Sequence, residues 1–212
     1  MKKYILLLAL LLSSTTFAVE PKFNDNFKQT KNEIETSSPE KIEVLELFWY
    51  GCIHCYSMDP YLDKWADSLP DDVVFKRVPA IPRKSWVPGA KAYYALETLG
   101  LEGKLHEKLF DAIHKEKDVD PNNEAALISW VTLNGKLDEK EVKAAFNSFS
   151  IDTKLKKSYK IFKEAGATGV PTIIIDGNYM TSSTMAGGEQ NAIDITNYII
   201  ENIRNDRKKT SE

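Results

Sequence analysis

The apolar positions of this chain change their spacing near residue 50. Residues 42–49 are mostly apolar and β-prone, a run typical of a strand that is buried on both faces of a sheet. From Tyr56 to Leu69 the apolar side chains recur instead at steps of three and four residues, the period of an amphipathic helix. The sequence therefore predicts a strand that leads through a short turn into a helix.

Weaker patterns predict the other strands. They are an edge strand within the polar stretch 19–41, anchored by Phe23, Phe27 and Ile34, and strands over residues 73–78, 172–175 and 179–180. Asp176-Gly177 lies between the last two runs, and Asp-Gly between apolar runs is a strong signal for a β-hairpin.

Residues 82–149 contain no strand-like run, and helical patterns follow one another there. These patterns span residues 90–99, about 105–113, 124–133 and 138–149. Asp138 is expected to cap the last of them, with Glu141 completing a capping box. A further helix ends at Gly166, and a closing helix follows Gly187-Gly188. The order of elements predicts an α/β fold in which helices are inserted between a βαβ unit and a ββα unit.

The N-terminus has a pattern of its own. Lys2-Lys3, an apolar run from Ile5 to Leu12 and Phe17-Ala18 predict a secretory signal peptide over residues 1–18, cleaved after Ala18. Its apolar run is too short to span a bilayer as a permanent helix. The alternative is a buried N-terminal helix. The remaining residues, 19–212, are expected to form one domain with a helical insertion at about residues 83–150.

Composition and charge exclude some classes of protein. The composition is that of an ordinary globular protein, neither low-complexity nor disordered. The formal net charge of −3 becomes −5 without residues 1–18, because that segment contains two lysines and no acidic residue. We therefore expect no nucleic-acid partner.

The predicted turn between strand and helix contains both cysteines of the chain, Cys52 and Cys55. A Cys-x-x-Cys pair is a redox dithiol, half of a metal site or two unrelated core thiols. Export into an oxidising compartment permits a disulfide. A disulfide that closes a four-residue loop restricts the unfolded chain very little, so a purely structural bond is a poor explanation.

Two motifs carry a resemblance to a known family. Glu46-Leu47-Phe48 leads into Cys52-Ile53-His54-Cys55, and Gly169-Val170-Pro171 leads into the predicted hairpin. Over essentially all of residues 19–212 the chain resembles the thioredoxin superfamily and, within it, the DsbA family of periplasmic thiol oxidases. The resemblance implies a thioredoxin-like fold with an inserted all-helical domain. Ile53 departs from the family, which usually has proline there, and the residues between the cysteines tune the redox potential.

Cys52 is the predicted nucleophile. At a helix N-terminus it faces unpaired backbone N–H groups and the positive end of the helix dipole, which favour the thiolate that attacks a disulfide. His54 is expected to turn toward this sulfur and to donate a hydrogen bond or a charge; the alternative is an exposed polar residue on the first turn. Cys55, one helical turn further and expected to be buried, would be the resolving thiol.

Glu46, Val170 and Pro171 complete the predicted site. The resemblance implies that Glu46 lies beneath Cys55 and shuttles a proton, whereas otherwise it would point to solvent at a sheet edge. It also implies a cis Val170-Pro171 bond beside the cysteines, with the main chain of Val170 pairing with an extended substrate strand. The alternative is an ordinary trans proline at the start of a strand.

The helical insertion would roof this surface and offer an apolar groove to an unfolded polypeptide. We assign no site to its aromatic and histidine side chains, which at helical spacing more often belong to a core: Trp86, Tyr93, Tyr94, Trp130, His106 and His114.

The leading hypothesis is a periplasmic thiol:disulfide oxidoreductase that donates its Cys52–Cys55 disulfide to unfolded exported polypeptides carrying thiols. A membrane partner of the DsbB type would reoxidise it, a monomer suffices for the chemistry, and neither a cofactor nor a metal is expected. The alternatives are a reductase or isomerase using the same dithiol, a metal-binding module using Cys52, Cys55 and His54, or a binding protein with an inert disulfide. A structural zinc site needs about four ligands, and no second cluster accompanies the first.

Overall fold

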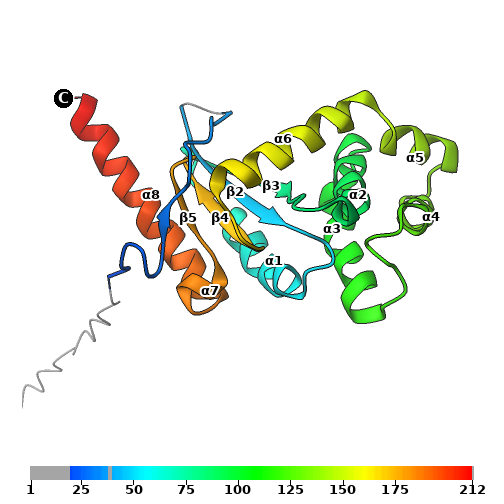
Figure 1. The fold of residues 1–212 in the computed structure, drawn as a ribbon, viewed down its shortest axis with the longest axis horizontal. Coiled ribbons are helices and arrows are strands. Elements are labelled where there is room, and N and C mark those ends of the chain that lie inside the picture. The colour runs from blue at the N-terminus through cyan, green and yellow to red at the C-terminus, as the bar shows by residue number, and fades with distance from the viewer. Residues whose placement is uncertain (1–19, 38–39, 212) are drawn as a thin grey trace, which may run out of the picture.

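The computed structural model of the chain describes residues 20–37 and 40–211 (Figure 1). The predicted signal peptide and its cleavage site lie outside the described residues. Over the ranges that are described, no helix is long and apolar enough to cross a membrane.

A five-stranded mixed sheet forms the centre of the fold (Figure 1). Its strands, in spatial order, are β1 (Lys28–Gln29), β5 (Tyr179–Thr181), β4 (Thr172–Ile175), β2 (Ile42–Phe48) and β3 (Val73–Pro79). Strands β2 and β3 run parallel, and the other neighbouring pairs are antiparallel. All seven residues of β2 are buried, as its apolar run predicted. The predicted edge strand is β1, and the predicted hairpin is β4 and β5.

Three helices cover the two faces of the sheet: α1 (Ile53–Ala66), α8 (Glu189–Ser211) and α6 (Phe149–Ala165). Alternate side chains of β2 enter different cores. Val44 packs in a cluster with Met58 of α1 and the apolar face of α8, whereas Leu45 packs in a cluster with Ile161 of α6. Strand β2 therefore lies between helices on both sides, which fixes the direction in which its C-terminal end presents the following turn.

Every element between β3 and α6 is helical: η1 (Lys84–Trp86), α2 (Val87–Thr98), α3 (Glu102–Asp111), the π-helical η2 (Ala112–Glu116), α4 (Glu124–Gly135) and α5 (Glu139–Phe146). These helices form a block at one end of the sheet, and α6 runs from the block back across the sheet (Figure 1). The block shares a core with Phe48 and Tyr50 at the end of β2. The predicted α/β fold with inserted helices is confirmed. The boundary of the insertion, at about residues 83–150, stays a prediction, because α6 packs against both parts.

Some local predictions were incomplete. The helix expected over residues 138–149 ends at Phe146, because Ser148 is the N-cap of α6 and its Oγ accepts a hydrogen bond from the Ile151 N–H. Asp138 caps α5 by accepting from the Lys140 N–H at 2.7 Å. Asp138 accepts from the second helical residue rather than from Glu141, and Glu141 makes no return bond in the part of the chain that the structure describes, so Asp138 caps the helix without a capping box.

Two further expectations differ from the structure near the chain ends. Phe23 is 50% exposed rather than a buried anchor, while Phe27 and Ile34 are buried. A short helix, α7 (Ser183–Ala186), lies between the hairpin and α8. Four residues are too few to show a helical period in the sequence, which explains why it was missed.

Candidate active site

Cys52 lies where β2 passes into α1. It is the N-cap residue of α1, with φ −94° and ψ 115°. Its N–H donates to the Trp49 carbonyl at 2.9 Å, and its carbonyl accepts from the Tyr56 N–H at 3.1 Å, which closes the first helical turn. The predicted position of Cys52 at the start of the helix is confirmed.

The surroundings of Cys52 favour its thiolate. Its pKa is lowered to about 6, chiefly by the hydrogen bond from the Cys55 thiol. Partial burial opposes this shift, whereas the backbone N–H groups of Cys55 and His54 and the charge of His54 support it. The His54 side chain itself is exposed. Cys52 is therefore mostly ionised at neutral pH.

Cys55 differs from Cys52 in both exposure and charge. Its side chain is fully buried. Its pKa is raised well above the usual value, first by burial, then by the hydrogen bond to Cys52 and by the charges of Cys52 and Glu46. Both residues are free thiols in this structure. The dithiol thus pairs an accessible, ionised sulfur with a buried, protonated one.

Val170 and Pro171 bring a distant loop to the cysteines. The peptide bond between them is cis, as predicted. The Cys52 Sγ lies 3.4 Å from the Val170 carbonyl oxygen, the contact that a protonated thiol makes as donor. Within residues 20–37 and 40–211 the Val170 N–H has no hydrogen-bond partner, and its pairing with an extended substrate stays a prediction. Ile53, next to Cys52, is 52% exposed.

Glu46 faces the interior, as one of the two expectations had it, and is 1% exposed. Its Oε2 lies 3.3 Å from the Nε of Arg77, the residue opposite it on β3. The two atoms lie within the distance of an ion pair but are not aligned for a hydrogen bond. Burial raises the pKa of Glu46 to about 8, and the opposing Arg77 charge does not overcome it. Glu46 therefore holds a proton at pH 7, while a proton-shuttling role stays a prediction.

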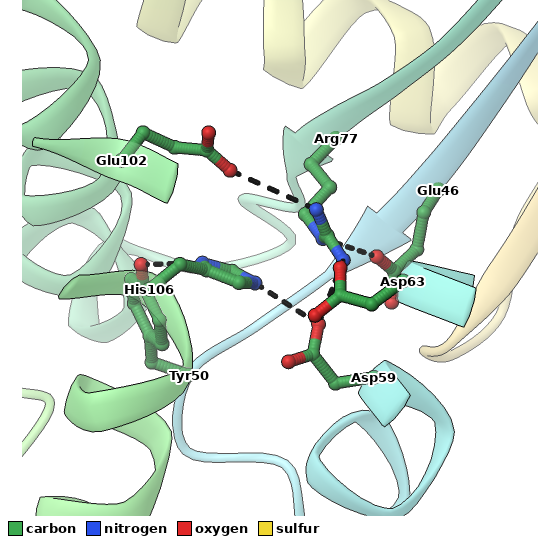
Figure 2. A network of polar contacts seen from close by, with 7 residues as sticks. All are labelled: Glu46, Tyr50, Asp59, Asp63, Arg77, Glu102 and His106. Atoms are coloured by element: carbon green, nitrogen blue, oxygen red, sulfur yellow. Dashed lines mark hydrogen bonds and ion pairs between the residues drawn. The ribbon is translucent and has the colours of Figure 1, made fainter. Parts of the chain in front are cut away.

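A buried polar network around Glu46 was not foreseen from the sequence (Figure 2). It joins side chains of β2, β3, α1, α3 and the active-site turn: Glu46, Arg77, Asp59, Asp63, Glu102, His106 and Tyr50. Two signals were present. Asp59 follows Cys55 by one helical turn and so shares its face. Arg77 is a charge in an apolar strand, as is Glu46.

The helical block contributes side chains to both core and site. Trp86, Tyr93 and Tyr94 are buried, so the core interpretation is confirmed for these three, and Trp130 is half-buried. His114, to which no chemistry was assigned, reaches the active-site turn, where its Nε2–H donates to the Tyr50 carbonyl at 2.7 Å. These contacts join residues far apart in the sequence, which helical periodicity does not register.

Known proteins resemble this chain in sequence and in structure. Residues 75–198 match the family described as DSBA-like thioredoxin domain. The thiol:disulfide interchange protein DsbA of Pseudomonas aeruginosa is 33% identical over 213 residues, covering 97% of this chain and 99% of that protein. The protein of the same name from Azotobacter vinelandii is 34% identical over 185 residues, covering 86% of this chain and 85% of that protein. A crystal structure of P. aeruginosa DsbA matches with a TM-score of 0.82 at 32% identity, covering 89% of this chain and 97% of that one.

These matches confirm the thioredoxin-like fold with inserted helices that the two motifs implied. The family match spans more than half of the chain, and both relatives exceed 30% identity over most of its length. The chain therefore belongs to the DSBA-like thioredoxin domain family and is a thiol:disulfide oxidoreductase.

Proposed function

We propose that this oxidoreductase works as an oxidase in the periplasm, where it passes a Cys52–Cys55 disulfide to newly exported polypeptides that carry free thiols. The observation that carries the proposal is the difference between the two sulfurs. A pKa of about 6 stabilises the Cys52 thiolate and hence the reduced enzyme. The disulfide form is correspondingly easy to reduce, which makes it an oxidant.

The reaction has two exchange steps. A substrate thiolate attacks the Cys52 sulfur, the Cys52–Cys55 bond breaks, and Cys55 leaves as a thiolate that takes up a proton. A second substrate thiolate then attacks the substrate sulfur of the mixed disulfide, and Cys52 leaves as a thiolate. Two electrons pass from the substrate to the enzyme, and the two exchange steps require no cofactor.

Glu46 is suited to supply the proton that Cys55 needs. It is buried and protonated at neutral pH, and its charge when ionised would oppose a Cys55 thiolate. Handing a proton to Cys55 leaves Glu46 as an anion beside Arg77, 3.3 Å away. The open Val170 N–H supports a substrate that lies along the cis-proline loop as an extended strand.

Export and reoxidation belong to the same proposal. Residues 1–18 have the pattern of a cleavable signal peptide. In the periplasm the reduced enzyme would pass its two electrons to a membrane partner of the DsbB type. Full-length protein expressed in a Gram-negative cell should appear in the periplasmic fraction with Val19 as its first residue. Retention in the cytoplasm at the level of a variant lacking residues 2–18 would contradict this location.

The direction of the reaction is tested by the redox equilibrium with glutathione. The purified protein is equilibrated in buffers of reduced and oxidised glutathione, and the reduced fraction is counted by thiol alkylation and mass. A potential above ~−200 mV supports the oxidase, because it exceeds the poise of the glutathione pool. A potential near ~−270 mV, that of a thioredoxin-type reductase, contradicts it.

A reductase or isomerase is the second candidate, and the observation that favours it is Ile53 in place of the usual proline. The same measurement decides between them. The metal-binding alternative has less support, because no three His, Cys, Asp or Glu side chains among the described residues are grouped to hold a metal ion.

A further inference from the structure

His106 connects the helical block to the charged groups around Glu46 (Figure 2). It lies on α3, is 4% exposed, and both of its ring nitrogens have partners. Nε2 is 3.1 Å from the Asp59 Oδ1 on α1, and Nδ1 is 2.8 Å from the Tyr50 hydroxyl. Three aromatic rings pack edge-on around the imidazole, those of Phe48, Tyr93 and Phe110. The ring is therefore held by packing as well as by its two polar contacts.

The contact with Asp59 fixes a hydrogen on Nε2 of the imidazole. Burial raises the pKa of Asp59, but the hydrogen bond and charge of His106 and the charge of Arg77 outweigh burial and hold it below the usual value. Asp59 is thus an anion that only accepts, so Nε2 must carry a hydrogen and donate. Burial raises the pKa of Tyr50 well above its usual value, so its hydroxyl keeps its hydrogen and can either donate to Nδ1 or accept from it.

Asp59 links this imidazole to Glu46. Its Oδ1 also accepts from the Arg77 Nη2 at 3.0 Å, so one carboxylate oxygen is shared by the imidazole and the guanidinium. Arg77 is in turn the cation beside Glu46. The other two acids on the guanidinium are more exposed, Asp63 at 48% and Glu102 at 31%, against 3% for Asp59. Asp59 is therefore the buried anion that competes with Glu46 for Arg77.

We propose that His106 is a positioning residue of the redox site: by donating to Asp59 it moderates the attraction between Asp59 and Arg77, and so keeps the guanidinium available to Glu46. It acts through these two residues and not by touching a sulfur. The proposal rests on the proposed function only for the role of Glu46 in the redox step. The contacts that carry it are those of Figure 2.

The expected direction follows from the charges. Without the hydrogen bond from Nε2, the Asp59 carboxylate interacts more strongly with Arg77. Asp59 raises and Arg77 lowers the pKa of Glu46. Asp59 then lacks its bond to His106, and Arg77 is held more tightly by Asp59. Both changes disfavour the Glu46 carboxylate, so Glu46 should titrate at a higher pH than in the unaltered protein. The other titratable groups that face the imidazole and its partners are the neutral Tyr50 and Tyr93 and the acidic Asp63 and Glu102, and substitution at position 106 leaves all four in place.

Two near-isosteric, uncharged variants separate the two contacts of the ring. His106→Gln places an amide N–H close to the position of Nε2 and preserves the bond to Asp59. His106→Asn places its amide near Nδ1 and does not reach Asp59. The readout is the pH titration of the Glu46 carboxyl carbon by NMR in the purified, reduced protein, with Glu46→Gln to assign the signal. We expect His106→Gln to match the unaltered protein and His106→Asn to raise the midpoint by about 0.5 pH unit or more, about threefold in the protonation equilibrium.

A second pair of variants keeps the test decisive if His106→Asn does not fold. Tyr50→Phe removes the hydroxyl that holds Nδ1, the other ring nitrogen, and so loosens the position of Nε2 against Asp59. It should move the midpoint in the same direction. Tyr94→Phe is its matched control, because it removes a buried hydroxyl that bonds to Ser158 outside the network; it should leave the midpoint unchanged.

The proposal is overturned if neither His106→Asn nor Tyr50→Phe moves the titration, or if His106→Gln moves it as far as His106→Asn. The titration is measured without substrate. A protein that fails to oxidise thiols would therefore defeat the proposed function and leave this test intact.

Discussion

Glu46 and Arg77 lie opposite each other on the parallel strands β2 and β3, with Oε2 and Nε 3.3 Å apart and side chains that are 1% and 9% exposed. The pair is close but not aligned for a hydrogen bond. Desolvation therefore outweighs attraction, and Glu46 keeps its proton at neutral pH. A buried acid with a pKa of about 8 makes the stability of this protein sensitive to mildly alkaline conditions.

Glu46→Gln should stabilise the protein at alkaline pH. The pKa of Glu46 is about 8 in the folded protein, above the ordinary 4.5 of the unfolded chain. Its favourable contribution is therefore complete below about pH 4.5 and is lost as pH rises through 8. Glutamine keeps the shape of the glutamate side chain but cannot ionise. Urea unfolding at pH 5 and pH 9 should show the variant gaining roughly 4 kcal/mol over the unaltered protein across that range.

Glu43→Gln is the matched control on the same strand. The pKa of Glu43 is lowered, because hydrogen bonds from Lys76 and Ser37 and the Lys76 charge outweigh burial. Its stabilisation is present above the unfolded value of 4.5 and is lost only as pH falls. This variant should be destabilised equally at pH 6 and pH 9. Parallel pH profiles for Glu46→Gln and the unaltered protein would contradict the prediction for Glu46.

Cys55→Ala should raise the pKa of Cys52 more than His54→Gln does. The hydrogen bond from the Cys55 thiol is the largest cause of the lowered pKa, and the charge of the exposed His54 is a smaller one. The rate of alkylation of Cys52 by iodoacetamide, followed from pH 4 to pH 9, gives the midpoint for each protein. The unaltered protein should show a midpoint near pH 6. A larger rise in His54→Gln than in Cys55→Ala would reverse the ranking.

Ile53→Pro should make the disulfide more oxidising without loss of the fold. Ile53 is the first residue of α1, a position that tolerates proline because its N–H has no helical partner. Proline fixes φ there and should hold Cys52 against the N–H groups of His54 and Cys55. The glutathione equilibrium measures the change, and Ile53→Ala controls for loss of the exposed side chain. Equal potentials in all three proteins would show that Ile53 in place of proline has no effect on the redox potential.

Gly51→Ala should destabilise the turn that bears Cys52. A Cβ at Gly51 would come within 2.5 Å of the Trp49 ring, which is stacked on Trp86 with ring centroids 4.1 Å apart. Displacing the indole should cost about 1–3 kcal/mol and change the tryptophan fluorescence. Gly103→Ala is the control, because nothing lies within 4 Å of a Cβ there. Urea unfolding should leave that variant unchanged or slightly more stable.

Local patterns were sufficient to place the cysteines. The apolar run of β2, the helical period after Tyr56 and the Asp176-Gly177 turn are all properties of neighbouring residues. The cis bond at Val170-Pro171 was implied by the family motif rather than by any period. Where a prediction depended on a boundary, as at Ser148, a single side-chain cap decided the outcome.

Such local patterns could not predict the network around Arg77. The bond between His106 and Asp59 joins residues 47 positions apart, on helices that meet only after the block has folded against the sheet. Periodicity tells which face of a helix is buried but not what it meets. It therefore placed His106 in a helix and left open that its ring contacts a carboxylate of α1.

The depth of Cys55 has a consequence for which sulfur an incoming thiol can reach. In the disulfide both sulfurs are electrophiles, but Cys52 is partly exposed in this structure and Cys55 is 0% exposed. Every bimolecular attack is thereby directed to Cys52, and reactions at Cys55 are confined to partners already tethered one helical turn away. Which sulfur is attacked is therefore set by side-chain packing beneath α1 rather than by the reactivity of the client.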